Sequence, residues 1–443
     1  MELAGWGRTP RASVRAARPE RLAEVLAAIG AADGRGIIAH GAGRSYGDQA
    51  LNDGGQVLLT GRLDRLLAFE PESGVLECEP GVSVGEVLRL FLPRGFALPV
   101  VPGTAFTTLG GAVANDVHGK NHDRAGSLGD HVEWLDLALA SGEVVRASPE
   151  TEPELFRATI GGCGLTGVIT RLALRMQPAA SRRVVAREER MANLDAFFAA
   201  FEAARGAAEF SVGWIDALER GGASGRGILE IGRFDPESGG DPPAGSRLPG
   251  VPFDFPSLAL HPLCVRLFNR YHLQRLDEAG RERVVPLERF LFPLDAIHDW
   301  NRVYGRRGFH QFQCVIPDVA ARAGIGALLA RVSRSGAASF LAVLKTLGST
   351  GRGHLSFALR GYTLALDFPH RRGIAALFAE LESIVRDHGG RVYLAKDSLL
   401  SAAGFAAMYP ELGSFREILH RVDPEGRFQS DMARRLEIRG AGS

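Results

Sequence analysis

The chain has 443 residues, of which 45% are hydrophobic and 23% charged, and its formal net charge is +1. This length exceeds what one hydrophobic core usually holds, so we expect two domains. The balanced charge argues against nucleic acid as a partner, and four cysteines without C-x-x-C spacing argue against zinc or a disulfide framework.

The sequence predicts neither a secretory signal nor a membrane span, because it has no apolar leader and no run of 18 apolar residues. We therefore expect a cytoplasmic protein or one peripheral to the inner membrane, while an envelope location stays open.

In chain order, hydrophobic periodicity and turn residues predict an α+β fold without the regular alternation of a doubly wound sheet. Ser83 is expected to cap a helix, and a Pro- and Gly-rich segment at 233–256 is expected to form a mobile loop. Expected strands are 36–40, 57–59, 67–69, 75–78, 132–140, 182–188, 341–347, 354–359 and 363–368, and expected helices are 19–29, 84–92, 194–204, 261–276, 326–332 and 374–388, followed by a charged helix near the end.

Two glycine-rich segments, His40–Asp48 and Pro102–His122, carry the clearest functional signal, and a third follows at Gly161–Gly167. Glycines let backbone N–H groups close on a phosphate and permit positive φ. Three such segments predict a large cofactor with two phosphates.

Three other readings of these segments deserve comparison. Gly43-Arg44-Ser45-Tyr46-Gly47 matches G-x-S-x-G, and glycines 41, 43 and 47 approach a dinucleotide fingerprint, but turn residues follow where both motifs need a helix. His118 and His122 have zinc spacing, yet Gly119 between them argues against a rigid helix and no H-E-x-x-H is present.

Five motifs along the chain resemble the vanillyl-alcohol-oxidase (PCMH-type) family of FAD-binding flavoproteins. The resemblance implies a discontinuous PCMH-type FAD-binding domain (1–182 and 391–443) and a substrate domain (183–390) built on an antiparallel sheet with flanking helices. The last three motifs are typical of a branch that acts on polyprenyl-linked sugar phosphates. The motifs are Gly43–Asp48, His118–His122, Phe309-x-Gln311-x-Gln313, Tyr393–Ser398 and Ser430–Leu436.

The resemblance implies FAD as the cofactor. Many relatives attach FAD through a histidine just before the loop serine, but Arg44 occupies that position here, so we predict non-covalent FAD. The residues expected around it are His40, Gly41, Ala42, Gly43, Arg44, Ser45, Tyr46, Gly47, Asp48, Gly103, Thr108, Leu109, Gly110, Gly111, Asn115, Asp116, Val117, His118, Gly119, Lys120, Ile169 and Tyr393.

Flavin oxidation of an alcohol needs a group that takes the hydroxyl proton and a positive charge near the flavin. Lys396 is the candidate for the cation, and it could act as a base only if burial or a neighbouring cation lowered its pKa. His118 is the second catalytic candidate, because its ordinary pKa suits proton transfer. No metal is expected.

The expected substrate-binding residues share the putative strands of the second domain. Lys345 interrupts an apolar strand. A lysine in such a position needs an anionic partner, and we expect a substrate phosphate to provide it. Relatives that react with nitroaromatic inhibitors carry cysteine at Ala365 and asparagine at Thr363, so we predict no covalent adduct here. The full set is Tyr46, Gln311, Gln313, Lys345, Thr363, Ala365 and Lys396.

The resemblance implies oxidation of the 2′-hydroxyl of decaprenylphosphoryl-β-D-ribose to a keto group, the first half of an epimerisation that supplies arabinose for cell-envelope polysaccharide. A partner reductase would complete it, and residues 233–276 would contact the membrane. Two alternatives stay open: an FAD-dependent oxidase of a soluble sugar alcohol or aldonolactone, and a non-catalytic sugar-binding protein.

Overall fold

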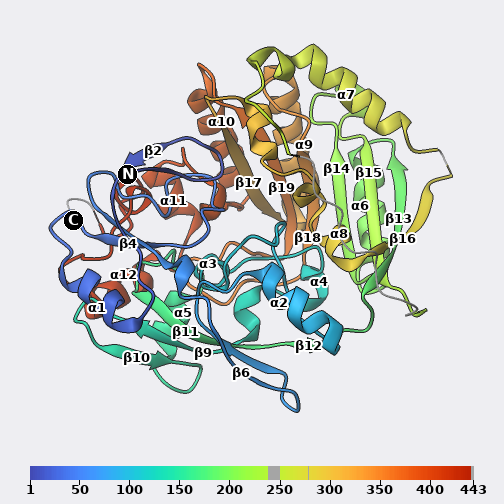
Figure 1. The fold of residues 1–443 in the computed structure, drawn as a ribbon. Helices are drawn as coiled ribbons and strands as arrows, with labels where there is room; N and C mark the ends of the chain where they lie inside the picture. The colour runs from blue at the N-terminus through green and yellow to red at the C-terminus, as the bar shows by residue number, and fades with distance from the viewer. Residues whose placement is uncertain (238–249, 278, 441–443) are drawn as a thin grey trace.

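The computed structural model describes residues 1–237, 250–277 and 279–440 (Figure 1). Most of the N-terminal half forms several small sheets, and the middle of the chain forms one large sheet. The C-terminal segment, red in Figure 1, returns to lie beside the blue N-terminal strands. The expected mobile loop at 233–256 falls largely on residues 238–249, outside the described part of the chain.

The N-terminal sheets are small because their strands are short and separated by tight turns. A parallel three-stranded sheet joins β3 (Arg15–Ala17), β5 (Gln56–Leu59) and β4 (Ile37–His40). An antiparallel five-stranded sheet has the order β10 (Val144–Ala147), β9 (Val132–Ala138), β11 (Val168–Arg175), β7 (Val75–Cys78) and β6 (Leu66–Glu70). Two-stranded pairs join β1 (Glu2–Ala4) to β2 (Arg11–Ser13) and β8 (Phe96–Ala97) to β12 (Gln177–Pro178).

The large sheet is antiparallel throughout and confirms the expected α+β class. Its order is β16 (Arg281–Pro286), β13 (Arg183–Met191), β15 (Gly227–Phe234), β14 (Phe210–Ile215), β18 (Ala342–Leu347), β19 (Gly361–Pro369), β17 (Phe309–Pro317) and β20 (Arg391–Val392). The domain limits expected at 182/183 and 390/391 remain predictions; the chain enters this sheet at β13 and leaves it through β20.

Helices α6, α9 and α10 pack on one face of the large sheet. The helices are α1 (Leu22–Gly30), α2 (Val84–Phe91), α3 (Leu109–Ala114), α4 (His122–Ala125), α5 (Pro153–Thr159), α6 (Leu194–Ala204), α7 (Pro262–Gln274), α8 (Leu287–Leu291), α9 (Asp318–Ser335), α10 (Ile374–Asp387), α11 (Ala402–Met408), α12 (Leu412–Val422) and α13 (Asp431–Arg435). None of the helices described is long and apolar enough to cross a membrane.

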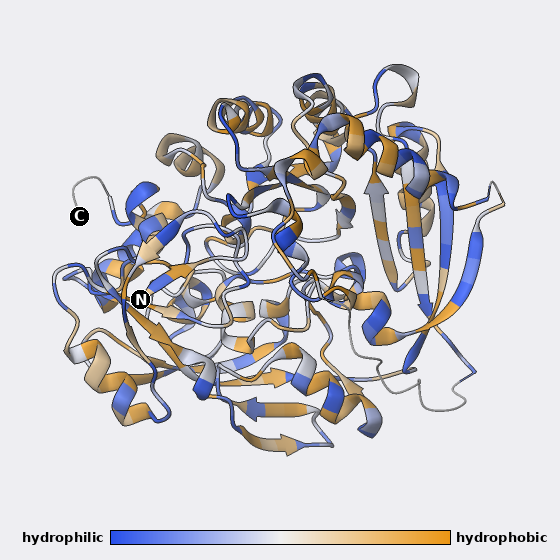
Figure 2. Ribbon diagram, turned by 45° about the horizontal axis from the view of Figure 1, so that its top comes forward, coloured by the Kyte–Doolittle hydropathy of each residue, from blue (hydrophilic) through white to orange (hydrophobic). Residues whose placement is uncertain are grey.

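Burial differs between the two halves of this sheet. Strands β17 and β19 are buried at nearly every position, whereas β13 alternates buried residues with more exposed ones and β16 buries only Val285. Figure 2 shows blue and orange residues mixed along the outer strands at its right. The centre of the sheet is therefore covered on both faces, by helices on one side and by the N-terminal part of the chain on the other.

Most expected elements are present, but two expectations differ from the structure. Residues 354–359 were expected to form a strand and instead run irregularly. Their polar groups bond elsewhere: Ser356 Oγ donates to Asp116 Oδ2 at 2.5 Å, and its carbonyl accepts from Arg391. Helix α3 was not expected, and it begins inside the second glycine segment, where the Thr108 hydroxyl accepts from the Gly111 N–H.

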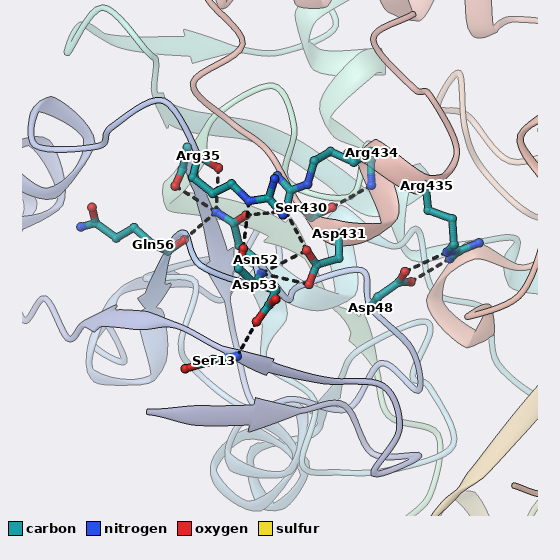
Figure 3. A network of polar contacts seen from close by, with 12 residues as sticks. Ser13, Arg35, Asp48, Asn52, Asp53, Gln56, Ser430, Asp431, Arg434 and Arg435 are labelled. Atoms are coloured by element: carbon teal, nitrogen blue, oxygen red, sulfur yellow. Dashed lines mark hydrogen bonds and ion pairs between the residues drawn. The ribbon is translucent and has the colours of Figure 1, made fainter. Parts of the chain in front are cut away.

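A network of ion pairs and hydrogen bonds connects the first glycine segment and the residues after it to the C-terminal segment (Figure 3). Arg435 donates to both carboxylate oxygens of Asp48 at 2.7 and 2.8 Å, and Arg434 donates to Asn52 Oδ1 at 2.7 Å. The Asp53 N–H donates to Asp431 at 3.0 Å. Bidentate pairs of this kind fix geometry as well as charge, so residues 40–53 are held from a point nearly 400 residues later in the chain.

Candidate active site

A cavity of about 360 Å³ lies between the glycine segments and the large sheet. Segments 39–51, 102–118 and 163–169 line one wall, and residues of β17, β18 and β19 form the opposite floor. Residues 294–300 lie at its edge, and Tyr393, Ala395 and Lys396 complete it. The structure thus brings the glycine segments together with polar strand residues that lie up to about 300 positions later in the chain, such as Gly41 and Lys345.

The wall of the cavity offers backbone donors. The N–H groups of residues 41–45 donate to no acceptor within the described part of the chain, and five adjacent amide donors form a concave anion site. Gly43 has φ +65°, a conformation that favours glycine. A Cβ at Gly47 would overlap the carbonyl oxygen of Asp397, so only glycine allows this close approach.

The floor of the cavity presents side chains in a regular grid. Across β17, β19 and β18, Gln313 is opposite Ala365 and Ala365 is opposite Val343. One row further, Thr363 is opposite Lys345. Residues directly opposite in an antiparallel pair share a face, as do residues two apart in one strand. The expected substrate residues of these strands therefore lie on the same face of the sheet, and all of them except Thr363 line the cavity.

Two lysines line the cavity, and no carboxylate lies within ion-pair distance of either among the described residues. Burial lowers the pKa of Lys396 to about 7; nearby Asp367 opposes this and Lys345 adds to it. Burial and Lys120 lower the pKa of Lys345 to about 8. Lys396 Nζ lies 3.9 Å from the centre of the Tyr46 ring, a cation–π contact that holds the ammonium group without neutralising it.

His118 is buried at the end of the cavity nearest Gln313. The Gln313 amide nitrogen lies 3.0 Å from His118 Nε2; because an amide N–H can only donate, Nε2 accepts and the ring proton is assigned to Nδ1. His118 Nδ1 has no protein partner. Burial, together with Lys345, His122 and Lys396, holds the pKa of His118 well below its usual value, so the ring is neutral at pH 7.

Asp367 is a site residue that the sequence interpretation missed. It is fully buried next to the floor, where it accepts from Gln311 Nε2 at 2.5 Å and from the Tyr304 hydroxyl at 3.0 Å. Burial raises its pKa to about 7. The sequence pattern that singled out Lys345, an ionisable residue within an apolar strand, also occurs at Asp367 and could have identified it. The edge of the cavity was missed as well: Arg44 stacks between Trp6 and Phe106, with ring-centre distances of 4.4 and 4.8 Å.

Several expected site residues do not line the cavity. Asp48 binds Arg435, Leu109 is in the core, and Asp116 accepts from the Gly129 N–H. Lys120 donates to the Phe290 carbonyl at 2.5 Å and lies 3.6 Å from Glu230, so its charge is already engaged. Thr363 stands behind Gln313 at 3.1 Å, and Gly119 packs against Val101. These residues support the walls from outside.

The other readings of the glycine segments find no support in the geometry. No helix follows Ser45 within residues 45–55, and its hydroxyl donates to Gln49 rather than to a histidine. Both ring nitrogens of His122 are occupied, by Ser127 and by the Gly348 N–H. No group of three metal-ligating side chains occurs in the described residues.

Comparison with known proteins gives matches in both halves of the chain. A family model of FAD binding domains matches residues 10–148, and one of D-arabinono-1,4-lactone oxidases matches residues 360–436. The decaprenylphosphoryl-β-D-ribose oxidase of Mycolicibacterium smegmatis is 36% identical over 450 residues, which cover 98% of this chain and 97% of that protein.

Two further relatives differ in extent. An uncharacterised protein of Streptomyces coelicolor is 36% identical over 375 residues, 81% of this chain and 100% of that protein. The D-arabinono-1,4-lactone oxidase of Eremothecium gossypii is 32% identical over 168 residues, 37% of this chain and 31% of that protein.

Proposed function

The chain belongs to the FAD-dependent oxidoreductase family of decaprenylphosphoryl-β-D-ribose oxidase, and we propose that it oxidises the 2′-hydroxyl of that polyprenyl-linked sugar phosphate to a keto group. The observation that carries this proposal is a cavity in which a glycine wall faces a strand floor, and whose two lysines have no carboxylate in ion-pair contact among the described residues. The wall suits the pyrophosphate of a dinucleotide, and the floor suits a phosphorylated sugar.

The residues of the cavity fit FAD. The free N–H groups of residues 41–45 would hold its pyrophosphate, and His118, Tyr393 and Lys396 would surround its reactive end. When bound, FAD would accept the hydride that leaves the sugar carbon, and the hydroxyl proton would pass to solvent in the cavity. Arg44 has no side-chain nucleophile for attachment, and the His40 ring is held by the Ala50 carbonyl at 3.0 Å. We expect dissociable FAD, so acid precipitation should leave a colourless protein pellet.

Lys396 and His118 take different roles in the proposed reaction. Lys396 supplies positive charge beside the reacting groups, in a buried site where charge acts strongly. His118 is neutral, and its Nε2 accepts from the Gln313 amide, so it would hold that amide in place at the floor for the substrate. Gln311 and Gln313 add amide groups on the floor for sugar hydroxyls.

Lys345 is the proposed binding group for the sugar phosphate. It lies on β18 in the same row as Thr363, and the nearby Lys120 is occupied by Glu230 and Phe290. Lys345 is thus a cation available to a ligand. A phosphate would raise the pKa of Lys345 from about 8 and keep it charged at neutral pH.

The decisive experiment is anaerobic reduction of the bound flavin. Decaprenylphosphoryl-ribose should bleach the visible flavin band of the purified protein, and free alditols should not. Bleaching by alditols or aldonolactones, without bleaching by the lipid-linked sugar, would contradict the proposal. Purified protein without any flavin band would favour the non-catalytic sugar-binding interpretation instead.

The match of residues 360–436 to D-arabinono-1,4-lactone oxidases favours one second candidate, an oxidase of soluble aldonolactones. That segment includes Ala365, Asp367 and Lys396, which form part of the floor and its support. Lys345 separates the candidates, because a neutral soluble sugar leaves its charge without a partner. The same bleaching experiment decides between them.

A lipid-linked substrate requires an approach to a membrane, and α7 offers the surface that we propose for it. Asn269 on its inner face donates to Asp216 at 2.7 Å and anchors the helix over the sheet. The outer face exposes Leu263 (61%), Leu267 (61%) and Tyr271 (71%) beside Arg266 and Arg270. An apolar stripe beside cations suits an anionic lipid surface.

Liposome co-sedimentation tests this surface. Leu267→Glu with Tyr271→Glu should abolish sedimentation with phosphatidylglycerol vesicles. Val319→Glu changes a fully exposed valine on α9 and is the matched control, expected to sediment normally. Equal sedimentation of both variants would contradict the proposed contact. The keto product would still need a separate reductase, which delivers hydride from the opposite face of the sugar to complete the inversion.

A further inference from the structure

The carboxyl group of Asp367 is buried, and no cation of the described residues makes an ion-pair contact with it, which is costly for a charged group. It lies on β19, directly opposite Gln311 of β17. A buried, unpaired carboxyl contributes little to the stability of the fold, because an apolar residue of similar size could fill the same space without the cost of burying a charge. Its position beside the cavity therefore calls for another explanation.

A continuous chain of contacts leads from this carboxylate into the cavity. Asp367 Oδ1 accepts from Gln311 Nε2 at 2.5 Å, and Gln311 in turn contacts the Tyr46 hydroxyl. The Tyr46 ring makes a cation–π contact with Lys396, whose Nζ lies 3.9 Å from the ring centre. Asp367 is thus linked to Lys396 through two side chains, in addition to the direct attraction between their charges.

The far side of the carboxylate is fixed as well. Asp367 Oδ2 accepts from the Tyr304 hydroxyl at 3.0 Å, and that hydroxyl lies 2.8 Å from Ser339 Oγ. Both oxygens are therefore engaged by donors, which favour the ionised form.

We infer that Asp367 is a positioning residue for the proposed oxidation, which orients the amide of Gln311 at the cavity floor and keeps the Lys396 ammonium charged. The inference rests on the proposed function. The groups that face the pair are known: Lys345 and His118 face Lys396, and Tyr46 and Tyr304 face Asp367. Of these groups, only the carboxyl of Asp367 can supply a negative charge near Lys396, and Lys345 opposes it.

The charge on Lys396 can be measured without turnover. Competitive acetylation of the holoenzyme across a pH series, followed by mass spectrometry, gives the pH at which the Lys396 amine loses its proton. We expect a midpoint near 7 in the unchanged protein. Asp367→Asn keeps the shape and removes the anion, so the midpoint should fall by about one pH unit.

A second variant and a control separate this effect from a general loss of structure. Tyr304→Phe removes one donor to the carboxylate, makes Asp367 harder to ionise and should shift the midpoint in the same direction by less. Asp423→Asn changes another fully buried carboxylate, bound to Arg439 and to backbone N–H groups away from the cavity, and should leave the midpoint unchanged.

An unchanged Lys396 midpoint in folded Asp367→Asn would overturn the inference, as would an equal shift in Asp423→Asn. If Asp367→Asn does not fold, an unchanged midpoint in Tyr304→Phe overturns it. The expected shifts in a protein that fails to oxidise decaprenylphosphoryl-ribose would contradict the proposed function but uphold the coupling between Asp367 and Lys396.

Discussion

The two sides of the cavity are built on different physical principles. The wall at residues 41–47 presents backbone N–H groups, and its side chains matter mainly by being absent or small. The floor on β17, β18 and β19 presents amides, a hydroxyl and charges at fixed register. A backbone wall binds any ligand with phosphates of the right spacing, whereas the floor can discriminate one substrate from another.

This difference teaches where each kind of substitution acts. A change at the wall alters space and backbone position, so it should affect cofactor retention and folding together. A change at the floor alters charge or hydrogen bonding at a well-supported position, so it should affect turnover or substrate affinity while the fold persists. The following predictions test that division, from the largest expected effect to the smallest.

Gly47→Ala should cause the largest loss. The added Cβ would overlap the Asp397 carbonyl and come within 2.8 Å of Ser398 Cβ, and backbone at such a contact cannot move aside cheaply. We expect unfolding free energy to fall by about 3 kcal/mol, together with loss of FAD, as measured by urea unfolding and flavin absorbance. Gly61→Ala, where a Cβ meets nothing within 4 Å, is the control. Normal FAD retention in Gly47→Ala would show that the wall is not rigid.

Lys396→Met should act on turnover alone. Removal of a buried charge beside the reacting groups typically costs about 10²–10³-fold in kcat, while methionine fills the space and FAD stays bound. In the unchanged protein kcat should fall as pH rises through about 7, because the ammonium then loses its proton. The variant should lack this alkaline decline. A kcat that instead rises through pH 7 in the unchanged protein would assign Lys396 the role of a base.

Lys345→Met should act on substrate affinity. A charge-assisted hydrogen bond to phosphate contributes about 1.5–3 kcal/mol, so KM for the lipid-linked sugar phosphate should rise roughly 10–100-fold with little change in kcat. Steady-state kinetics measure both constants. The affinity for FAD, measured by fluorescence titration, is the internal control and should not change. Weaker FAD binding with unchanged KM would move the Lys345 contact from substrate to cofactor.

The wall was largely predictable from sequence, and the floor only in part. The glycines clustered at 41–47 predict the wall from local sequence alone, because this residue type itself implies close approach of a ligand. Helix α6 and strand β7 were predicted with their observed bounds, since hydrophobic periodicity is also local. FAD as cofactor and the family followed from motifs that span the chain, and the comparisons confirm them.

Features that depend on distant partners were not predictable in this way. The role proposed for Asp367 depends on its contact with Gln311, which is 56 residues earlier in sequence but directly opposite in the sheet. The 354–359 strand was wrong because an alternating apolar pattern does not reveal that Ser356 bonds to Asp116 and Arg391. The roles assigned to individual site residues, and the domain limits, stay predictions.

Ala365→Cys should have the smallest effect on the proposed reaction and gives the finest test of the floor. Ala365 lies on the cavity face of β19 between Gln313 and Val343, so a thiol there would reach the cavity without displacing a polar group. We expect kcat and KM within about twofold of the unchanged protein, because the substitution adds a single atom to a residue that makes no polar contact. The unchanged protein should gain no mass after turnover with a nitroaromatic inhibitor, whereas the variant should. An adduct on the unchanged protein would mean that another nucleophile faces the cavity, and Lys396, with a pKa of about 7, would then be the group to examine.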